Sequence, residues 1–256
     1  DFYRRLIDNL LNRNIEPFLT LNHWDIPQVF LEKGGWTNRD CIKYFLDYSE
    51  IVSREYGDIV KYWITHNEPW VISNCGYKDG IHAPGEQLFY ESLKVNHNLL
   101  VSHGEAVPII RENSRESKVG IVLNLTPGMP ASNSGSDIKA TKLFNQFFNE
   151  WFLDPLYGKE YPKEVAEHWI NKGLFDGIDF VENGDYDTIS VPTDFLGINY
   201  YSRGIIRCED TKEEDNLPVQ VLAGDKTDFE WEVYPDGLRD ILIDVHKRYS
   251  PNSIYI

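Results

Sequence analysis

Residues 60–69 read Val60-Lys61-Tyr62-Trp63-Ile64-Thr65-His66-Asn67-Glu68-Pro69, a mostly apolar run that ends in polar side chains. Aromatic and β-branched residues dominate the first part of the run, which is typical of a buried strand. Pro69 cannot extend a strand ladder, so the strand is expected to end at Asn67 and Glu68. The run therefore predicts a buried strand with a carboxamide and a carboxyl group at its carboxyl end.

Helices and strands alternate upstream of this run. Apolar residues recur at helical spacing over residues 2–11, and the short apolar stretch 15–21 ends in Asn22-His23-Trp24. Thr37-Asn38 can cap a second helix, and Gly57 is placed to end it. The order upstream is therefore helix, strand, helix, strand.

The same alternation continues downstream. The sequence pattern predicts helices near residues 88–113, 137–157, 162–172 and 235–249, and strands at 118–123, 195–200 and 253–256. The acidic stretch from Glu209 to Glu230 is expected to form a long surface excursion.

Repeated strand-helix units predict an α/β protein with a parallel sheet, either doubly wound or closed as a barrel. We favour a (β/α)8 TIM barrel, because polar and aromatic residues follow the strands at His23-Trp24, Asn67-Glu68 and Tyr200-Tyr201. No glycine-rich phosphate loop follows a strand, which weakens the dinucleotide-binding alternative. The pattern contains about five strands where a barrel needs eight. We therefore expect one incomplete catalytic domain over residues 1–256, without the first two strands and the last one or two.

Composition excludes several kinds of partner. The net charge is −16, from 25 Lys and Arg against 41 Asp and Glu, so nucleic acids and anionic membranes would be repelled. No apolar run reaches the length of about 18 residues that predicts a membrane span. The three cysteines are widely spaced and form no CxxC pair, which indicates neither a zinc site nor a disulfide framework. We expect a cytoplasmic protein without metal or cofactor, acting on a small neutral molecule. The oligomeric state stays open.

Two polar clusters could serve a ligand. Asn67 can hydrogen-bond a hydroxyl and Glu68 can donate a proton, although the tripeptide Asn-Glu-Pro alone also fits a solvated turn that starts a helix. His23-Trp24 fits either core packing or a platform for a flat ligand.

Several longer strings resemble glycoside hydrolase family 1, and they occur in the family's order along nearly the whole chain. They are Ile15-Glu16-Pro17 through Leu21, Asn22-His23-Trp24-Asp25-Ile26-Pro27-Gln28, Gly34-Gly35-Trp36-Thr37-Asn38-Arg39, Tyr62 through Pro69, Gly76-Tyr77 with Gly80-Ile81-His82-Ala83-Pro84-Gly85, Asn96 through Leu100, Trp151 through Pro155, and Phe195 through Ser202.

The resemblance implies a retaining β-glucosidase that hydrolyses terminal β-glucosyl residues of β-glucosides and cello-oligosaccharides. Glu68 would be the acid/base of a double displacement, first protonating the leaving oxygen and later activating water. Asn67 would bind the sugar 2-hydroxyl, and His23 and Trp24 would line the same subsite.

Three later residues are assigned by the same resemblance. Tyr201 would orient the nucleophile, Asn199 would contact substrate, and Trp231 would be the aromatic platform for the aglycone or next sugar. Packing under a loop is the other reading of Trp231. The family nucleophile is the Glu of a Thr-Glu-Asn-Gly string that follows a strand resembling Ile254-Tyr255-Ile256, and the chain ends before it. We therefore expect this chain alone to be inactive and poorly stable.

Other functions stay open. Relatives acting on 6-phosphorylated sugars carry Phe where this chain has Trp24, so the resemblance favours unphosphorylated β-glucosides over a 6-phospho-β-glucosidase or a related β-glycosidase. An endo-acting barrel hydrolase would share Asn-Glu-Pro but not the surrounding strings. A catalytically silent sugar-binding homologue would keep the pocket and lack the nucleophile.

Overall fold

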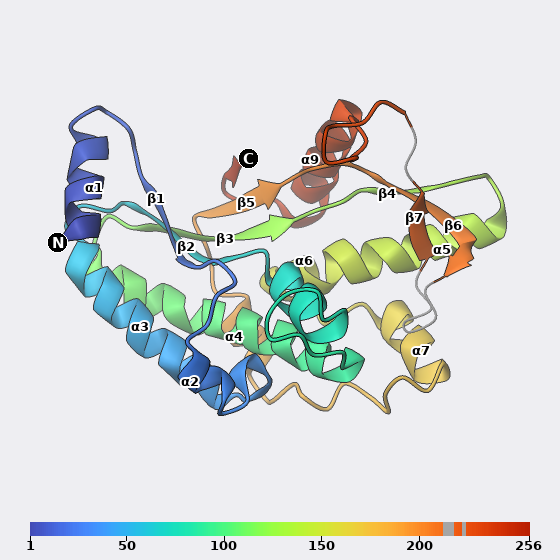
Figure 1. The fold of residues 1–256 in the computed structure, drawn as a ribbon, viewed down its shortest axis with the longest axis horizontal. Helices are drawn as coiled ribbons and strands as arrows, with labels where there is room; N and C mark the ends of the chain where they lie inside the picture. The colour runs from blue at the N-terminus through green and yellow to red at the C-terminus, as the bar shows by residue number, and fades with distance from the viewer. Residues whose placement is uncertain (212–217, 222–223) are drawn as a thin grey trace. The chain divides into compact units, whose positions relative to one another are not determined.

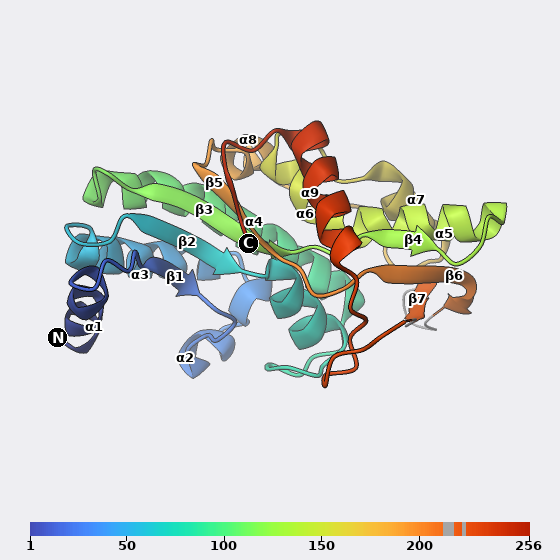
Figure 2. The ribbon, with the colours of Figure 1, turned by 90° about the horizontal axis from the view of Figure 1, so that it is seen from above.

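The computed structural model describes residues 1–211, 218–221 and 224–256, with side chains at 1–208 and 224–256 (Figures 1 and 2). The chain forms two compact units. The first comprises Asp1–Leu123, Glu182–Gly197 and Asn252–Tyr255, and the second comprises Asn124–Val181 and Ile198–Pro251 with Ile256. Part of the expected surface excursion lies outside the described residues.

A five-stranded parallel sheet carries the predicted strands. It is formed by β1 (Phe18–Asn22), β2 (Tyr62–Asn67), β3 (Lys118–Asn124), β5 (Phe195–Asn199) and β8 (Ile254–Tyr255). Their order in the sheet is β1-β2-β3-β5-β8, the same as their order along the chain. A doubly wound sheet would reverse direction at a switch point. The observed order therefore supports the barrel interpretation.

The sheet is strongly curved. The Phe18 and Tyr255 rings, on the two edge strands, have centroids 5.0 Å apart. Four steps across a flat sheet would separate such residues by roughly 19 Å. Phe195, on the strand beside β8, contacts both rings, with centroid distances of 5.8 Å to Phe18 and 5.3 Å to Tyr255. The aromatic contacts show that the strands curl toward one another at their amino ends, as barrel strands do.

The first unit also contains several helices, of which α4 contacts strand β2 of the sheet. They are α1 (Phe2–Leu11), α2 (Gln28–Leu31), the 3-10 turn Gly35–Thr37, α3 (Asp40–Tyr56), the π-helix Val71–Lys78, α4 (Phe89–Asn113) and α8 (Asp185–Ile189). Figure 1 shows α3 and α4 lying side by side along one face of the sheet. The core there is mostly aliphatic and aromatic and includes Trp36, Phe45, Trp63, Leu99, Val107 and Val119.

The ends of two predicted elements have specific physical causes. The Asp40 amide donates to Asn38 Oδ1 (3.0 Å), which confirms Asn38 as a cap of α3. Gly57 directly follows α3 as expected, with a right-handed backbone (φ −66°), and glycine is required there because a Cβ would lie 2.4 Å from the Ser53 carbonyl oxygen and 2.6 Å from that of Asn113. Strand β1 starts three residues later than expected, since the Ile15 amide still donates to the Leu10 carbonyl (3.0 Å) at the end of α1.

The second unit differs more from the prediction. It contains β4 (Gly128–Pro130), β6 (Gly204–Thr211) and β7 (Pro218–Val221), which form a small sheet in the order β4-β6-β7. The sequence predicted none of these strands. Strand β4 pairs with β6 across about 80 residues of sequence, which no local pattern reports, whereas β6 and β7 pair antiparallel with each other inside the stretch expected to be a surface excursion. The expected surface excursion is thus partly a paired sheet.

Helices make up the rest of the second unit. They are α5 (Gly135–Asn145), the π-helix Gln146–Glu150, α6 (Trp151–Leu156), α7 (Lys163–Asn171) and α9 (Pro235–Tyr249). The predicted single helix 137–157 is therefore interrupted by a π-helical segment. In the core of the second unit, the buried side chains of Trp151 and Trp169 pack edge to face, with ring centroids 5.2 Å apart. In the part of the chain that the structure describes, no helix is both long and apolar enough to cross a bilayer.

Candidate active site

Glu68 lies at the carboxyl end of β2, as predicted, and is only 3% exposed. Its backbone is left-handed, with φ of 51°, a conformation that costs a residue with a Cβ about 1–3 kcal/mol. The Glu68 amide donates to the Val122 carbonyl of β3 (2.8 Å), and the Glu68 carbonyl accepts from the Val71 amide (2.9 Å). The strand thus turns sharply at Glu68 and leads into the π-helix Val71–Lys78.

Asn67 and His23 connect the ends of two neighbouring strands. The pairing of β2 with β3 shifts register between Ile64 and Asn67, so a bulge precedes the turn. Bulges often re-aim side chains beside functional sites. Asn67 Nδ2 lies 3.4 Å from His23 Nε2, at the end of β1. The structure therefore brings together two of the predicted site residues directly, and Glu68 follows Asn67 in the chain.

Trp24 is half exposed, which argues against core packing. Its side chain is 36% exposed and its backbone is left-handed, with φ of 81°. Its ring centroid lies 5.1 Å from that of His23 and 5.4 Å from that of His82. Trp24 and Glu68 are both left-handed and both follow a parallel strand, and such backbone outliers concentrate at functional sites.

His82 is a candidate residue that the sequence analysis did not single out. It lies in the loop Gly80–Gly85, where its amide donates to the Cys75 carbonyl (2.9 Å) and its imidazole ring contacts Trp24. The available signal was a histidine within the string Gly80-Ile81-His82-Ala83-Pro84-Gly85, one of those that resemble the family. Its proximity to Trp24 depends on how the π-helix Val71–Lys78 and the loop after it fold, and could not be read from residue spacing.

A layer of neutral polar groups supports β2 from the helix side. His66 Nε2 lies 2.8 Å from Ser102 Oγ, and His103 Nδ1 lies 2.7 Å from Thr65 Oγ1. Burial lowers the pKa of His103 to about 3. Burial, and then the nearby His103, lower the pKa of His66 well below its ordinary value. Both rings are therefore neutral near pH 7 and hold β2 against α4 without adding charge beneath Glu68.

The remaining predicted residues belong to the second unit. Asn199 ends β5, and its carbonyl accepts from the Leu125 amide (3.0 Å). Tyr201 is 50% exposed and Trp231 is 43% exposed, with ring centroids 4.7 Å apart. Trp231 is therefore not packed beneath a loop. The predicted residues thus form two groups, one in each compact unit.

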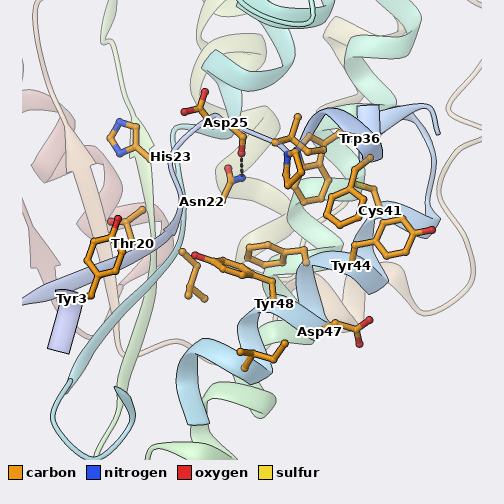
Figure 3. Close-up of a pocket in the computed structure, with 16 residues that line it drawn as sticks. Tyr3, Thr20, Asn22, His23, Asp25, Trp36, Cys41, Tyr44, Asp47 and Tyr48 are labelled. Carbon is orange, nitrogen blue, oxygen red and sulfur yellow. Dashed lines mark hydrogen bonds between the residues drawn. The ribbon is translucent and has the colours of Figure 1, made fainter. Parts of the chain in front are cut away.

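A pocket of about 740 Å³ opens beside β1 in the first unit (Figure 3). Its lining comes from α1, β1, residues 25–27, α2, the 3-10 turn Gly35–Thr37 and α3, and it includes the aromatic side chains of Tyr3, Tyr44 and Tyr48. Asn22 and His23 also line it, and Asn22 Nδ2 donates to the Asp25 carbonyl (3.3 Å). Glu68 is not among its lining residues. The cavity therefore borders the candidate active site at Asn22 and His23, whereas Glu68 at the carboxyl end of β2 lies outside its lining.

Comparisons with known proteins agree with this arrangement. The pattern of the family described as "Glycosyl hydrolase family 1" matches residues 1–256. "Beta-glucosidase A" of Acetivibrio thermocellus is 42% identical over 100% of this chain and 57% of its own length. "1,4-beta-D-glucan glucohydrolase" of Thermotoga neapolitana is 39% identical, covering 100% and 59% respectively. "6-phospho-beta-glucosidase GmuD" of Bacillus subtilis is 34% identical, covering 100% and 57%.

Solved structures show the same fold. The "AHE enzyme from Alicyclobacillus herbarius" matches with a TM-score of 0.94 at 38% identity, over 100% of this chain and 57% of that one. The "Beta-glucosidase from Thermotoga maritima in complex with glucoimidazole" matches with a TM-score of 0.89 at 37% identity, covering 100% and 56%. The chain spans about 57% of the length of the first of these curated relatives. Family pattern, sequence relatives and fold agree, and the chain belongs to glycosyl hydrolase family 1.

Proposed function

We propose that the protein containing this chain is a retaining β-glucosidase and that Glu68 is its acid/base. The observation that carries the proposal is the position of Glu68: buried, left-handed and at the end of a parallel strand, next to an Asn67 that contacts His23. The names of the relatives from Acetivibrio thermocellus and Thermotoga neapolitana support the substrate class.

Glu68 protonates the glycosidic oxygen as the bond to the anomeric carbon breaks, and its carboxylate later takes a proton from the attacking water. Asn67 and His23 bind hydroxyls of the same sugar, and the half-exposed Trp24 indole packs on its apolar face. The mechanism requires a second carboxylate as nucleophile. We assign that role to the Glu of a Thr-Glu-Asn-Gly string in the protein that contains this chain.

Leaving-group dependence tests the role of Glu68. In the full-length protein, Glu68→Gln should lower kcat/KM roughly 10²–10⁴-fold for alkyl glucosides and much less for 2,4-dinitrophenyl glucoside, whose leaving group needs no proton. Glu105→Gln, a half-buried carboxylate on α4, is the matched control and should change neither substrate appreciably. An equal loss on both substrates would assign Glu68 a structural role.

Two further measurements test the rest of the proposal. Proton NMR of the first product should show β-glucose, since double displacement retains configuration, and initial α-glucose would refute retention. Because GmuD is named as a 6-phospho-β-glucosidase, the kcat/KM for an aryl β-glucoside is to be compared with that for the same glucoside phosphorylated at the 6-position. A higher kcat/KM for the phosphorylated substrate would replace the proposed substrate class with the alternative one.

A further inference from the structure

A buried polar cluster lies directly behind the turn at Glu68. The π-helix Val71–Lys78 follows this turn, and all of its residues are buried. Ser73 and Asn74 of the π-helix and Asn96 of α4 are each 0% exposed. Burying polar side chains costs free energy unless hydrogen bonds replace their contacts with water. The arrangement of hydrogen bonds within the cluster therefore decides what it does.

The three side chains form a chain of hydrogen bonds that begins on α4. The Ser73 hydroxyl has the Pro69 and Trp70 carbonyls within reach, at 3.0 Å and 3.1 Å, but its shortest contact is Asn96 Oδ1 at 2.6 Å. A hydroxyl donates one proton and accepts on its lone pairs. With its proton on Asn96, Ser73 accepts from Asn74 Nδ2 (3.2 Å). The other amide proton of Asn74 goes to the Trp70 carbonyl (3.1 Å).

This chain ends on the peptide group that holds Glu68. The carbonyl of the peptide group between Trp70 and Val71 accepts from Asn74, and its amide donates to the Glu68 carbonyl (2.9 Å). The peptide group is thus held at both ends. A left-handed residue with a Cβ persists only where its surroundings fix it by several contacts. The cluster supplies one of these contacts from the side of α4.

Helix α4 also holds the strand that leads into Glu68. His103 Nδ1 lies 2.7 Å from Thr65 Oγ1, shortly before Glu68, and Asn96 accepts from Ser73 shortly after it. Asn96 and His103 are about two helical turns apart, so they project from the same face of α4. One helix face therefore fixes the chain on both sides of the candidate acid/base.

We propose that Ser73, anchored by Asn96, is a positioning residue for Glu68. The hydrogen-bond chain fixes the peptide group between Trp70 and Val71, and through it the left-handed turn that aims the Glu68 carboxyl group. The proposal rests on the proposed function for the proton transfer, and on the buried contacts alone for the position of the turn. Ser73 touches neither the substrate nor the reacting atoms in this scheme.

Leaving-group kinetics in the full-length protein test this role. A displacement of about 1 Å can cost a catalytic group on the order of 10² in rate. Ser73→Ala should therefore lower kcat/KM about five- to fiftyfold for alkyl β-glucosides. The loss should be less than about twofold for 2,4-dinitrophenyl β-glucoside, whose leaving group needs no proton. An equal loss on both substrates, or no loss on either, would overturn the proposal.

Ser49→Ala is the matched control for Ser73→Ala. Ser49 is also 0% exposed, and its hydroxyl donates to the Phe45 carbonyl (2.7 Å), one turn earlier on α3. The substitution removes a buried serine hydroxyl away from Glu68. It should leave the ratio of the two kcat/KM values at that of the parent protein. A changed ratio in Ser49→Ala would show that any buried serine has this effect, which contradicts a specific role for Ser73.

A double variant separates positioning from folding. Within the described part of the chain, Asn96 Nδ2 has no hydrogen-bond partner, so Asn96→Leu removes only the contact with Ser73. Replacing both partners of a buried hydrogen bond by apolar groups costs little stability. Ser73→Ala/Asn96→Leu should melt at or above the temperature of Ser73→Ala and keep its loss on alkyl glucosides. Parental kcat/KM in the double variant would refute the positioning role.

Hydrogen exchange distinguishes this proposal from the proposed function. If Glu68→Gln showed no dependence on the leaving group, the proposed function would fail, and exchange would still test the turn. The Val71 amide, which donates to the Glu68 carbonyl, should exchange about three- to tenfold faster in Ser73→Ala than in the parent, with the amides of β3 unchanged. Unchanged exchange at Val71, or equal acceleration throughout β3, would contradict the proposal.

Discussion

Glu68 and Trp231 are presented in opposite ways. Glu68 is 3% exposed at the end of a parallel strand, whereas Trp231 is 43% exposed on the hairpin 225–233, which is closed by backbone hydrogen bonds. Hydrogen bonds from two neighbouring segments fix the backbone of Glu68, while an ion pair at Glu232 fixes only the base of the hairpin. The role proposed for Glu68, proton donation, needs precise placement, whereas the role proposed for Trp231, stacking against a sugar, needs open area and tolerates variation. The two regions should therefore respond differently to substitution.

The largest contrast is expected between two tryptophans. Trp63 is completely buried in the first unit's core, so Trp63→Ala should lower the free energy of unfolding of the full-length protein by about 3–5 kcal/mol. Trp231→Ala should change it by less than about 1 kcal/mol and lower kcat/KM for oligosaccharides instead. Urea denaturation measures the free energy of unfolding of both variants, and steady-state kinetics measure their kcat/KM. A large stability loss for Trp231→Ala would remove the contrast.

Acid should destabilise the first unit selectively. Its buried His66 and His103 have pKa values lowered by burial, so the unfolded chain binds protons that the folded one excludes. Stability should therefore fall as the pH drops below about 6.5 toward 3, by roughly 3 kcal/mol per pH unit for the two groups together.

Hydrogen exchange at pH 7 and pH 5 would locate this effect in β2 and α4. His103→Asn should reduce the pH slope, and His246→Asn on α9 should leave it unchanged because that side chain is exposed. A uniform loss of protection across both units would contradict the assignment.

A smaller effect is expected at the base of the hairpin. Glu232→Gln leaves the Arg203 guanidinium without its bidentate carboxylate and should cost about 1–3 kcal/mol. Glu164→Gln breaks a surface pair with Lys142 and should cost less than about 1 kcal/mol. Thermal unfolding gives the stability loss of each variant. Equal losses would show that the Glu232–Arg203 ion pair stabilises the fold no more than a surface pair does.

The smallest effect concerns Glu230. Glycine adopts the left-handed conformation without strain but loses more entropy on folding, so Glu230→Gly should raise stability by less than about 1 kcal/mol. Urea denaturation of Glu230→Gly beside the parent protein measures the change. A clear loss of stability would show that the left-handed backbone at Glu230 stores no strain.

The extent of successful prediction differed between the two units. In the first unit, local pattern predicted all of the sheet strands, and Asn38 as a cap of α3 was confirmed. In the second unit, β4 and β6 are joined by pairing between segments about 80 residues apart, which no local period reports. The π-helical break after Asn145 was also missed, since it changes the helical pattern by a single residue per turn.

The sequence by itself determined the alternation of strands and helices, the parallel sheet of an α/β barrel, and the place of Glu68 at the end of a strand. These follow from side-chain period and from Pro69, which are local properties. Only the tertiary structure decided that Trp24 lies against His82, that Trp24 and Glu68 are left-handed, and that Phe229 extends the exposed ring of Trp231. Each of these depends on how separate segments pack or how a turn closes, and none of the three is encoded in residue spacing.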